Sequence, residues 1–386
     1  MGASADVAIK QQSHDGRLWR DGAMLLVTPQ HSRTKVDAAG DELIRLLNMS
    51  PADIRNDTAK WTSAFEAALA VIGNWRLSHN WPLLSVRTTL NGRAASVSQH
   101  AIIAQRLKRL PAIVAKLTRF RNMKLSQMQD IGGCRAIMPT VSHVERLAKI
   151  YRQAHSARRK NQPELIETYD YIAKPKSDGY RGIHLVYKYW SRNPRYGKLG
   201  GLRLEMQLRS QVQHAWAAAV ETVDIFTRQA LKSGIGDDRW KRFFVLMGGA
   251  LAIRENRPLV AEAPADKKAL SDELRQLSSD LHVETVLQGW GKVVEQLPRK
   301  TSGLSAFLLV LDPDGKTLRI QAYEQQEIKQ ASEDYLKVER EILRDSRNQA
   351  VLVNVKSLKS LRSAYPNFYL DTTAFVEAMQ EACAIA

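Results

Sequence analysis

Residues 202–210 read LRLEMQLRS and predict a β-strand with one apolar and one polar face. Successive side chains of a strand point to opposite sides of the sheet. The apolar set is Leu202, Leu204, Met206 and Leu208, and the polar set is Arg203, Glu205, Gln207 and Arg209. We expect the apolar face to belong to a core. The polar face is either a solvated surface, with Glu205 paired to an arginine, or the wall of a cleft in which Glu205 is a functional carboxylate.

A second strand is predicted just upstream, where residues 176–190 read KSDGYRGIHLVYKYW. Asp178-Gly179 favours a tight turn, because glycine tolerates a positive φ. The alternation from Ile183 onward indicates a strand. Tyr180 therefore lies at the entrance of this strand, where loops often carry binding groups. It is either an amphipathic residue on a surface turn or part of a binding site.

A second carboxylate occurs in QMQDIGGCRAIM, residues 127–138, where Asp130 precedes two glycines and a predicted strand. Aspartate in this position is often a turn or capping residue. It could instead bind a cation, since Mg²⁺ at phosphate sites is held by one or two carboxylates together with phosphate oxygens. Two carboxylates beside basic residues are suited to phosphoryl-type transfer.

The remaining pattern predicts a mixed α/β or α+β fold. Helices are expected at residues 57–75, from about Ser96, from Pro111, at 142–154 and at 211–231. Further strands are expected at LLSVRTTL (83–90), CRAIM (134–138) and LIETY (165–169).

The composition predicts three parts joined by a linker. Residues 1–56 are expected to be a loosely ordered arm, and residues 57–254 the domain that carries the motifs. The prolines of residues 255–269 indicate a linker. Residues 270–386 predict a small separate α/β domain, for which a regulatory role is left open. Its expected elements are a helix near 270–296, a hairpin around DPDG (312–315), a charged helix, a strand AVLVNV (350–355) and a final helix.

The charge of the chain favours a polyanionic partner such as nucleotides or RNA. The 386 residues carry a formal net charge of +17. Basic residues gather between Arg106 and Arg121, without one acidic residue, and again at Arg158, Arg159 and Lys160. No apolar run approaches the length of a membrane span and no signal peptide is evident, so we expect a cytoplasmic protein. Cys134 and Cys383 are too few for a cysteine zinc site.

The order of five short segments resembles the synthetase domain of the RelA/SpoT family. The segments are Arg106-Leu-Lys108, Ile113-Val-Ala-Lys116, Asp130-Ile-Gly-Gly-Cys-Arg135, Gly179-Tyr180-Arg181-Gly-Ile-His184 and Glu205-Met-Gln207-Leu-Arg209. The resemblance covers roughly residues 60–230. It implies a nucleotidyltransferase-like mixed sheet with flanking helices, and transfer of pyrophosphate from ATP to the 3′-hydroxyl of GDP or GTP, giving (p)ppGpp.

The resemblance also implies roles for individual residues. Asp130 and Glu205 would be catalytic and would bind Mg²⁺. ATP would be held by Arg106, Lys108, Lys116 and Arg135. The acceptor would be held by Lys174, Lys176, Tyr180, His184, Gln207 and Arg209, with Tyr180 stacked on its base. Long family members carry an upstream hydrolase domain, which we do not expect here, because the His14-Asp15 pair has no matching histidines around it.

Three departures from the family pattern leave other functions open. They are Ala112 in place of serine, Asp178 in place of asparagine, and Ala217-Ala218 in place of Ala-Glu. Asp178 adds negative charge beside a phosphorylated acceptor. The resemblance therefore indicates the type of reaction more strongly than the identity of the acceptor. One alternative is a toxic relative that pyrophosphorylates adenosine nucleotides or the 3′ end of tRNA, and the other is a non-catalytic RNA-binding module. No membrane partner is expected, and a homo-oligomer is left open.

Overall fold

The computed structural model describes residues 26–156, 162–227, 231, 236–289, 294–296, 304–345, 348–353, 361, 364–365, 368 and 372–384. Within these residues, nine strands form one sheet in the order β3-β4-β5-β2-β1-β9-β7-β8-β6. The pairs β2–β5 and β6–β8 are parallel and the others are antiparallel. The predicted mixed sheet with flanking helices is therefore confirmed. The strands are β1 (Ile102–Leu107), β2 (Gly132–Met138), β3 (Glu164–Asp170), β4 (Ile183–Lys188), β5 (Arg203–Ser210), β6 (Val294–Gln296), β7 (Leu304–Asp312), β8 (Thr317–Glu324) and β9 (Gln349–Val353).

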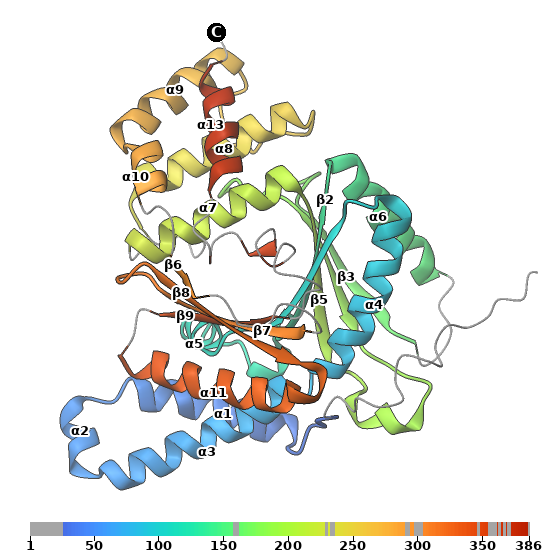
Figure 1. Ribbon diagram of the computed structural model, residues 1–386, viewed down its shortest axis with the longest axis vertical. Helices are drawn as coiled ribbons and strands as arrows, with labels where there is room; N and C mark the ends of the chain where they lie inside the picture. The colour runs from blue at the N-terminus through green and yellow to red at the C-terminus, as the bar shows by residue number, and fades with distance from the viewer. Residues whose placement is uncertain are drawn as a thin grey trace, which may run out of the picture.

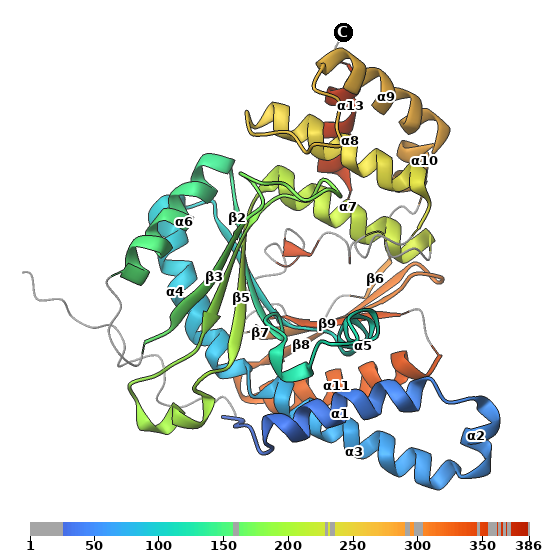
Figure 2. The same ribbon diagram turned by 180° about the vertical axis from the view of Figure 1, so that it is seen from behind.

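The sheet is sharply bent, so that its two halves enclose an angle (Figure 1). The first half contains β1 to β5 and the second contains β6 to β9, and they join where β1 pairs with β9 through Arg106 and Val353. Figure 2 shows the same bend from behind. Helices cover the outer faces and close the top of the angle. They are α1 (Arg33–Leu47), α2 (Pro51–Asn56), α3 (Thr58–Leu77), α4 (Asn80–Val97), α5 (Leu110–Arg119), α6 (Val141–Ser156), α7 (Gln211–Thr227), α8 (Asp238–Arg254), α9 (Lys267–Asp280), α10 (Val283–Gly289), α11 (Ile328–Asp345) and α13 (Thr373–Cys383).

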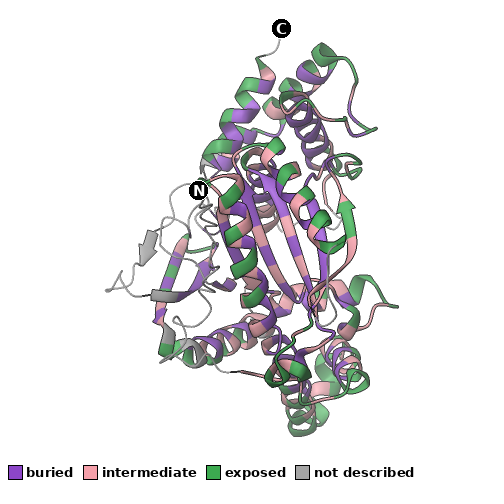
Figure 3. Cartoon of the chain, turned by 90° about the vertical axis from the view of Figure 1, so that its right-hand side faces the viewer, coloured by how far each residue is buried: buried purple, intermediate pink, exposed green. Residues whose placement is uncertain are grey.

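The main core includes the outer face of β1 to β5 with helices α4 and α6, and it extends to buried residues of α1, α3 and α5. The apolar face of β5 belongs to it, since Leu204, Met206 and Leu208 are buried there. Figure 3 shows the alternation of buried and intermediate residues along these strands. The two faces predicted for residues 202–210 are therefore confirmed. Among the described residues, no helix is both long enough and apolar enough to span a bilayer.

Two predicted elements of the N-terminal half are wrong. Residues 83–90 lie within helix α4, whose buried residues Leu83, Val86, Leu90 and Ala94 recur at helical spacing. The short window of eight residues, with its β-branched side chains, favoured a strand. The helix expected from about Ser96 is also wrong, because α4 ends at Val97 and strand β1 follows.

The predicted N-terminal arm is ordered in part. Ser32 caps helix α1, accepting a hydrogen bond from the backbone of Lys35. Val36 and Leu43 on α1 are buried in the main core. The expectation of a loose arm is therefore wrong for residues 33–47, and residues 1–25 lie outside the described residues.

The segments on the two sides of the predicted linker share cores. The chain does leave helical structure between α8 and α9, as expected. However, Phe243 and Phe244 of α8 pack against Phe375 of α13, and β9 joins the sheet beside β1. The boundaries at residues 57, 255 and 270 stay a prediction, but the few contacts expected across residues 255–269 are not what the structure has.

Within the C-terminal part, the hairpin β7–β8, the charged helix α11 and the final helix α13 are confirmed. The long helix expected at 270–296 is wrong. Two helices, α9 and α10, meet at His282, whose φ of 48° interrupts the helical path. Residues 294–296 form strand β6 instead. Residues 354–355 of the predicted strand AVLVNV lie outside the described residues, as does the basic cluster at 158–160.

Candidate active site

The polar face of β5 is on the inner side of the bend, between the two halves of the sheet. The sheet register adds polar side chains from the neighbouring strands. Glu205 lies opposite Gly133 of β2, while Gln207 lies opposite Arg135 of β2 and His184 of β4. Directly paired residues share a face. The register therefore gathers five of the predicted site residues on one surface, namely Arg135, His184, Glu205, Gln207 and Arg209.

Five of the predicted site residues form a closed ring of hydrogen bonds through their side chains. Two bonds hold Glu205: His184 Nδ1 lies 2.8 Å from its Oε1, and Gln207 Nε2 donates to its Oε2 at 2.7 Å. Arg209 Nη2 donates to Gln207 Oε1 at 3.0 Å, and its Nε donates to the Tyr180 hydroxyl at 3.1 Å. The Tyr180 hydroxyl lies 2.5 Å from His184 Nε2, which closes the ring. Each side chain is thereby fixed by two others.

The ring holds its members in defined charge states. Burial opposes the charge of Glu205, but attraction to His184 and hydrogen bonds from His184 and Gln207 lower its pKa to about 2. Burial likewise opposes the protonation of His184, yet the neighbouring Tyr180 and Glu205 raise its pKa to about 9. Glu205 and His184 are therefore a charged pair at neutral pH. Burial would raise the pKa of Tyr180, whereas Arg209 and His184 lower it to about 8.

Asp130 forms a second charged cluster before the start of β2. Its Oδ2 accepts a hydrogen bond from Lys108 Nζ at 2.7 Å, and its Oδ1 one from Lys116 Nζ at 3.0 Å. Burial would raise the pKa of Asp130, but the two ammonium groups lower it, against the opposing charge of Glu205. Lys108 follows β1 and Lys116 belongs to α5. Three segments that are separate in the sequence therefore meet at this carboxylate.

A strip of guanidinium groups crosses the same face. Arg106 of β1, Arg135 of β2 and Arg209 of β5 are close enough to influence one another. Burial, then repulsion from Arg209 and Arg106, lowers the pKa of Arg135 to about 10. The Nε of Arg135 is buried without a hydrogen-bond partner in the described part of the chain. A phosphate chain would supply the negative charge that this strip lacks.

The turn before β4 has the predicted conformation. Gly179 has a φ of +89°, and a Cβ there would lie 2.7 Å from the carbonyl oxygen of Phe244. The Asp178 carboxylate accepts a hydrogen bond from the Tyr180 backbone N–H at 2.9 Å. An asparagine oxygen can accept the same bond. The departure at Asp178 therefore preserves the turn and changes only its charge.

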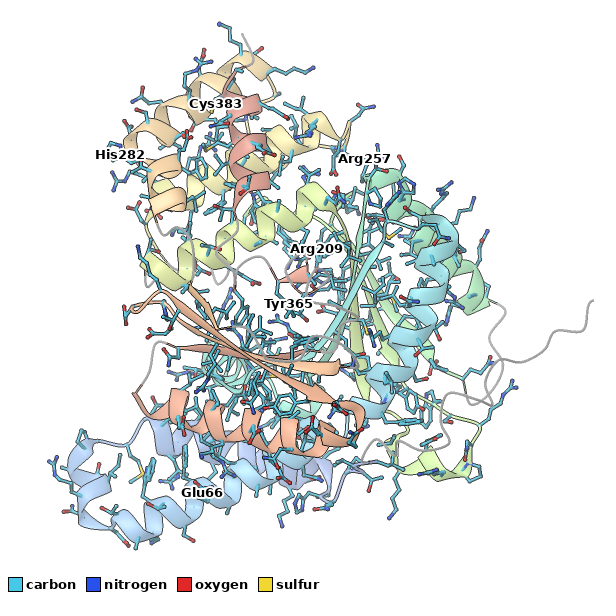
Figure 4. The ribbon with its side chains drawn as sticks, viewed as in Figure 1. Glu66, Arg209, Arg257, His282, Tyr365 and Cys383 are labelled. Atoms are coloured by element: carbon cyan, nitrogen blue, oxygen red, sulfur yellow. The ribbon has the colours of Figure 1, made fainter. Side chains whose placement is uncertain are left out.

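A cavity of about 410 Å³ opens beside this turn. Tyr180, His184 and Arg209 line one side of it, and Trp216 of α7 and Phe244 of α8 line the other. Figure 4 shows Arg209 in the angle of the sheet, on the same side as Tyr365. The volume of this cavity falls within the range of small-ligand sites, about 300 to 1,000 Å³.

The aromatic wall of this cavity was missed by the sequence analysis. Trp216 stands edge-on to Tyr180, with ring centroids 6.1 Å apart, and also edge-on to Phe244 at 5.8 Å. The His-Ala-Trp stretch after β5 was a usable signal for Trp216. Phe244 had none, because its helix is brought to the turn only by tertiary packing.

The predicted acceptor residues do not all lie at the cavity. The Lys176 ammonium stands 5.2 Å from the centroid of the Tyr180 ring and 4.5 Å from that of Tyr171. Lys174 is exposed on the preceding turn, away from the lining of the cavity. Cations therefore flank the tyrosine, as expected, but Lys174 is not one of those that contact it.

The two carboxylates fit Mg²⁺ only as a site completed by phosphate. In the described part of the chain there is no group of three or more His, Cys, Asp and Glu side chains that could hold a metal ion. Asp130 and Glu205 are both ionised oxygen donors, and Mg²⁺ often binds through one or two carboxylates plus substrate phosphates. In this structure both oxygens of each carboxylate accept hydrogen bonds. Each ionised carboxylate oxygen keeps a further lone pair for an ion, and bound phosphates would give Lys108 and Lys116 a second anionic partner.

The fold and this surface define a mixed α/β protein whose sheet face combines two ionised carboxylates with a strip of arginines. Residues 105–224 match the family described as "Region found in RelA / SpoT proteins". The match includes all five segments on which the predicted resemblance to this family rests. A comparison with curated proteins finds no match.

Solved structures resemble parts of the chain at low identity. A GTP pyrophosphokinase family protein from Streptococcus pneumoniae is 20% identical, with a TM-score of 0.36, over 46% of this chain and 85% of that one. Small alarmone synthetase 1 from Bacillus subtilis bound to its product pppGpp is 18% identical, with a TM-score of 0.33, over 55% of this chain and 94% of that one. The same enzyme bound to AMPCPP is 18% identical, with a TM-score of 0.32, over 54% and 94% of the two chains.

Proposed function

We propose that the chain transfers pyrophosphate from ATP to the 3′-hydroxyl of GDP or GTP, producing AMP and (p)ppGpp. The observation that carries the proposal is the joint presence, on one sheet face, of the closed ring around Glu205, the Asp130–lysine cluster and the arginine strip. In the reaction the 3′-oxygen bonds to the β-phosphorus of ATP, the bond from that phosphorus to the AMP oxygen breaks, and the proton of the 3′-hydroxyl is released to solvent. The family match of residues 105–224 supports this class of reaction.

The residues of the donor side would hold the triphosphate. The positive charge comes from Arg106, Lys108, Lys116 and Arg135. The Nε of Arg135 is buried and has no hydrogen-bond partner among the described residues. Asp130 and Glu205 would hold Mg²⁺, which supplies positive charge to the phosphates when bound. The low pKa of Glu205 makes it a weak proton acceptor. It is therefore better suited to stabilise positive charge than to accept the proton of the 3′-hydroxyl. We therefore assign Glu205 to charge and metal binding rather than to general-base catalysis.

The acceptor would enter the cavity beside Tyr180. The aromatic side chains of Tyr180, Trp216 and Phe244 suit a nucleobase, and Lys176 and Arg209 suit its phosphates. A purely RNA-binding role is less well supported, since the charged ring would then hold a carboxylate on the binding surface for no purpose.

A different acceptor is the second candidate, because of the net charge of +17 and the carboxylate of Asp178 at the cavity. This candidate transfers the same group to an adenosine nucleotide or to the 3′ end of tRNA. Asp178 would repel a phosphorylated mononucleotide more than the terminal ribose of tRNA, which carries no terminal phosphate.

The experiment that separates the acceptors uses ATP labelled in its β-phosphate. We expect labelled (p)ppGpp with GDP or GTP, and no labelled product with ATP alone or with deacylated tRNA. The rate with GDP should change little between low and physiological salt, whereas binding of tRNA through several phosphates should weaken by orders of magnitude. Labelling of tRNA alone, with a steep dependence on salt, would replace the proposed acceptor.

Variants of Tyr180 separate two roles of this residue: stacking on a base and the hydrogen bonds that its hydroxyl makes in the closed ring. Replacing Tyr180 by Ala should raise the KM for the acceptor about 5- to 150-fold, corresponding to about 1 to 3 kcal/mol for a stacked base. Tyr180→Phe keeps the ring but removes the partner of His184 and Arg209, so it should leave this KM near that of wild type and lower kcat about tenfold. Steady-state kinetics with the acceptor varied gives both values. An unchanged KM in Tyr180→Ala would exclude stacking.

A further inference from the structure

A second cavity lies on the face of the sheet opposite the candidate active site. It has a volume of about 240 Å³ and lies between α4 and α6. Arg93 of α4, Tyr151 and His155 of α6, Tyr187 of β4 and Met206 of β5 contribute to its lining. Of these residues only Met206 lies within one of the five motif segments, and its side chain is on the face of β5 opposite Glu205 and Gln207. The proposed function uses none of them.

The hydroxyl of Tyr151 lacks a hydrogen-bond partner, which indicates that the cavity takes a ligand. Tyr151 is only 2% exposed, and its hydroxyl oxygen is buried with no hydrogen-bond partner in the described residues. Buried hydroxyl groups are nearly always paired, because leaving one unpaired is unfavourable. Burial, against the opposing effect of the neighbouring Arg93, raises the pKa of Tyr151, so the group stays an O–H at neutral pH, and Arg93, itself a donor, cannot accept its proton. The cavity therefore contains a donor that lacks an acceptor.

Arg93 gives the cavity a positive charge. Its guanidinium carbon lies 4.4 Å from the centroid of the Tyr151 ring. No carboxylate of the described chain forms an ion pair with Arg93. An aromatic face stabilises an arginine without neutralising it. The cation and the hydroxyl donor thus stand together, and one acceptor that carries negative charge would satisfy both.

The walls of the cavity limit the size of the ligand. Tyr187 stands edge-on to Tyr151 with ring centroids 6.0 Å apart, and Met206 is 1% exposed. These side chains form an apolar surface beside the two polar groups. Sites for drug-sized ligands measure about 300 to 1,000 Å³, so this cavity suits a molecule smaller than a nucleoside triphosphate.

We propose that the cavity between α4 and α6 binds a small organic anion. Its carboxylate or phosphate group pairs with Arg93 and accepts the hydrogen bond of the Tyr151 hydroxyl, and its apolar body lies against Tyr187 and Met206. Met206 lies between Glu205 and Gln207 on β5, with its side chain on the opposite face. The ligand therefore contacts the back of the strand that carries the candidate active site.

The test measures direct binding to the full chain by calorimetry, without ATP or acceptor. The probes are benzoate, phenyl phosphate and the neutral benzyl alcohol. We expect saturable binding of benzoate, of phenyl phosphate or of both, at least about tenfold tighter than that of benzyl alcohol. Binding of only one anionic probe identifies the anionic group that the cavity takes.

Four variants locate the binding. Arg93→Gln should weaken it at least about tenfold, and Tyr151→Phe about fivefold, because each removes one partner of the anion while keeping the shape of the cavity. Arg146→Gln, which removes an exposed charge from α6, should leave binding within about twofold of wild type. Arg209→Gln removes a charge from the opposite face and should likewise have no effect.

Three results would overturn the proposal. They are no saturable binding of either anionic probe, binding that Arg93→Gln leaves unchanged, and binding that Arg209→Gln abolishes. The last would place the anion at the candidate active site. Because no substrate is present, failure here leaves the proposed pyrophosphate transfer untouched.

Discussion

Glu205→Gln and Asp130→Asn are each expected to reduce pyrophosphate transfer about a hundredfold or more. Both substitutions keep the size of the side chain and remove one negative charge. Glu205 faces the protonated His184, and Asp130 faces Lys108 and Lys116, so each variant leaves cations without their counter-charge. Loss of a single preorganised electrostatic group at a reacting centre typically costs about 3 kcal/mol, which corresponds to about a hundredfold in rate.

Turnover of labelled ATP with saturating acceptor and Mg²⁺ gives the measurement, and thermal unfolding shows whether the variants remain folded. Glu42→Gln is the matched control, since it removes an exposed carboxylate that pairs with Arg45 on α1, far from the site in the sequence. We expect this control to retain full activity. Near wild-type turnover of both site variants would mean that the reaction does not occur at these carboxylates.

The side of the sheet that carries the site could be predicted from the sequence because alternation in a strand is a local property. The pattern of residues 202–210 places Glu205, Gln207 and Arg209 on one face whatever the rest of the chain does. The closed ring could not be predicted, because it depends on register. A shift of one residue between β4 and β5 would move His184 away from Glu205.

The elements that were wrong depend on longer-range packing. Helix α4 is recognisable only when Leu83, Val86, Leu90 and Ala94 are compared over more than two turns, since its central residues are rich in Val and Thr. Helix α1 is held by the core rather than by its sequence alone. The same is true of Phe244, whose contact with the turn at Gly179 depends on the packing of α8.

The expectation of few contacts across residues 255–269 was wrong for a related reason. A proline-rich stretch ends a helix, but it does not determine whether the following elements return to the same core. In this chain they do, and one of the buried contacts is ionic. Arg76 of α3 pairs with Glu339 of α11 at 2.5 Å, and both side chains are 1% exposed.

Arg76→Met or Glu339→Leu alone is expected to lower the free energy of unfolding by about 3 to 5 kcal/mol, because each leaves a buried charge without its partner. Glu339 also accepts the backbone N–H of Leu110, at the start of α5, and Arg76 Nε donates to the Lys108 carbonyl at 3.0 Å. The pair thus connects α11 to the segments that carry Lys108 and Lys116. We therefore also expect a higher KM for ATP in whichever single variant remains folded.

The double variant and a second ion pair test this explanation. Arg76→Met with Glu339→Leu removes both charges and should be less destabilised than either single variant. Arg340 and Glu66 join the same two helices at 3.4 Å but are 44% and 39% exposed, so removing either should cost less than about 1 kcal/mol. Glu66 lies on α3 at the lower surface in Figure 4. Urea denaturation of the full chain measures all five variants. If the buried and the exposed pairs have equal effects, α11 is not anchored through Arg76, and the C-terminal part is held by its other contacts, such as the pairing of β9 with β1.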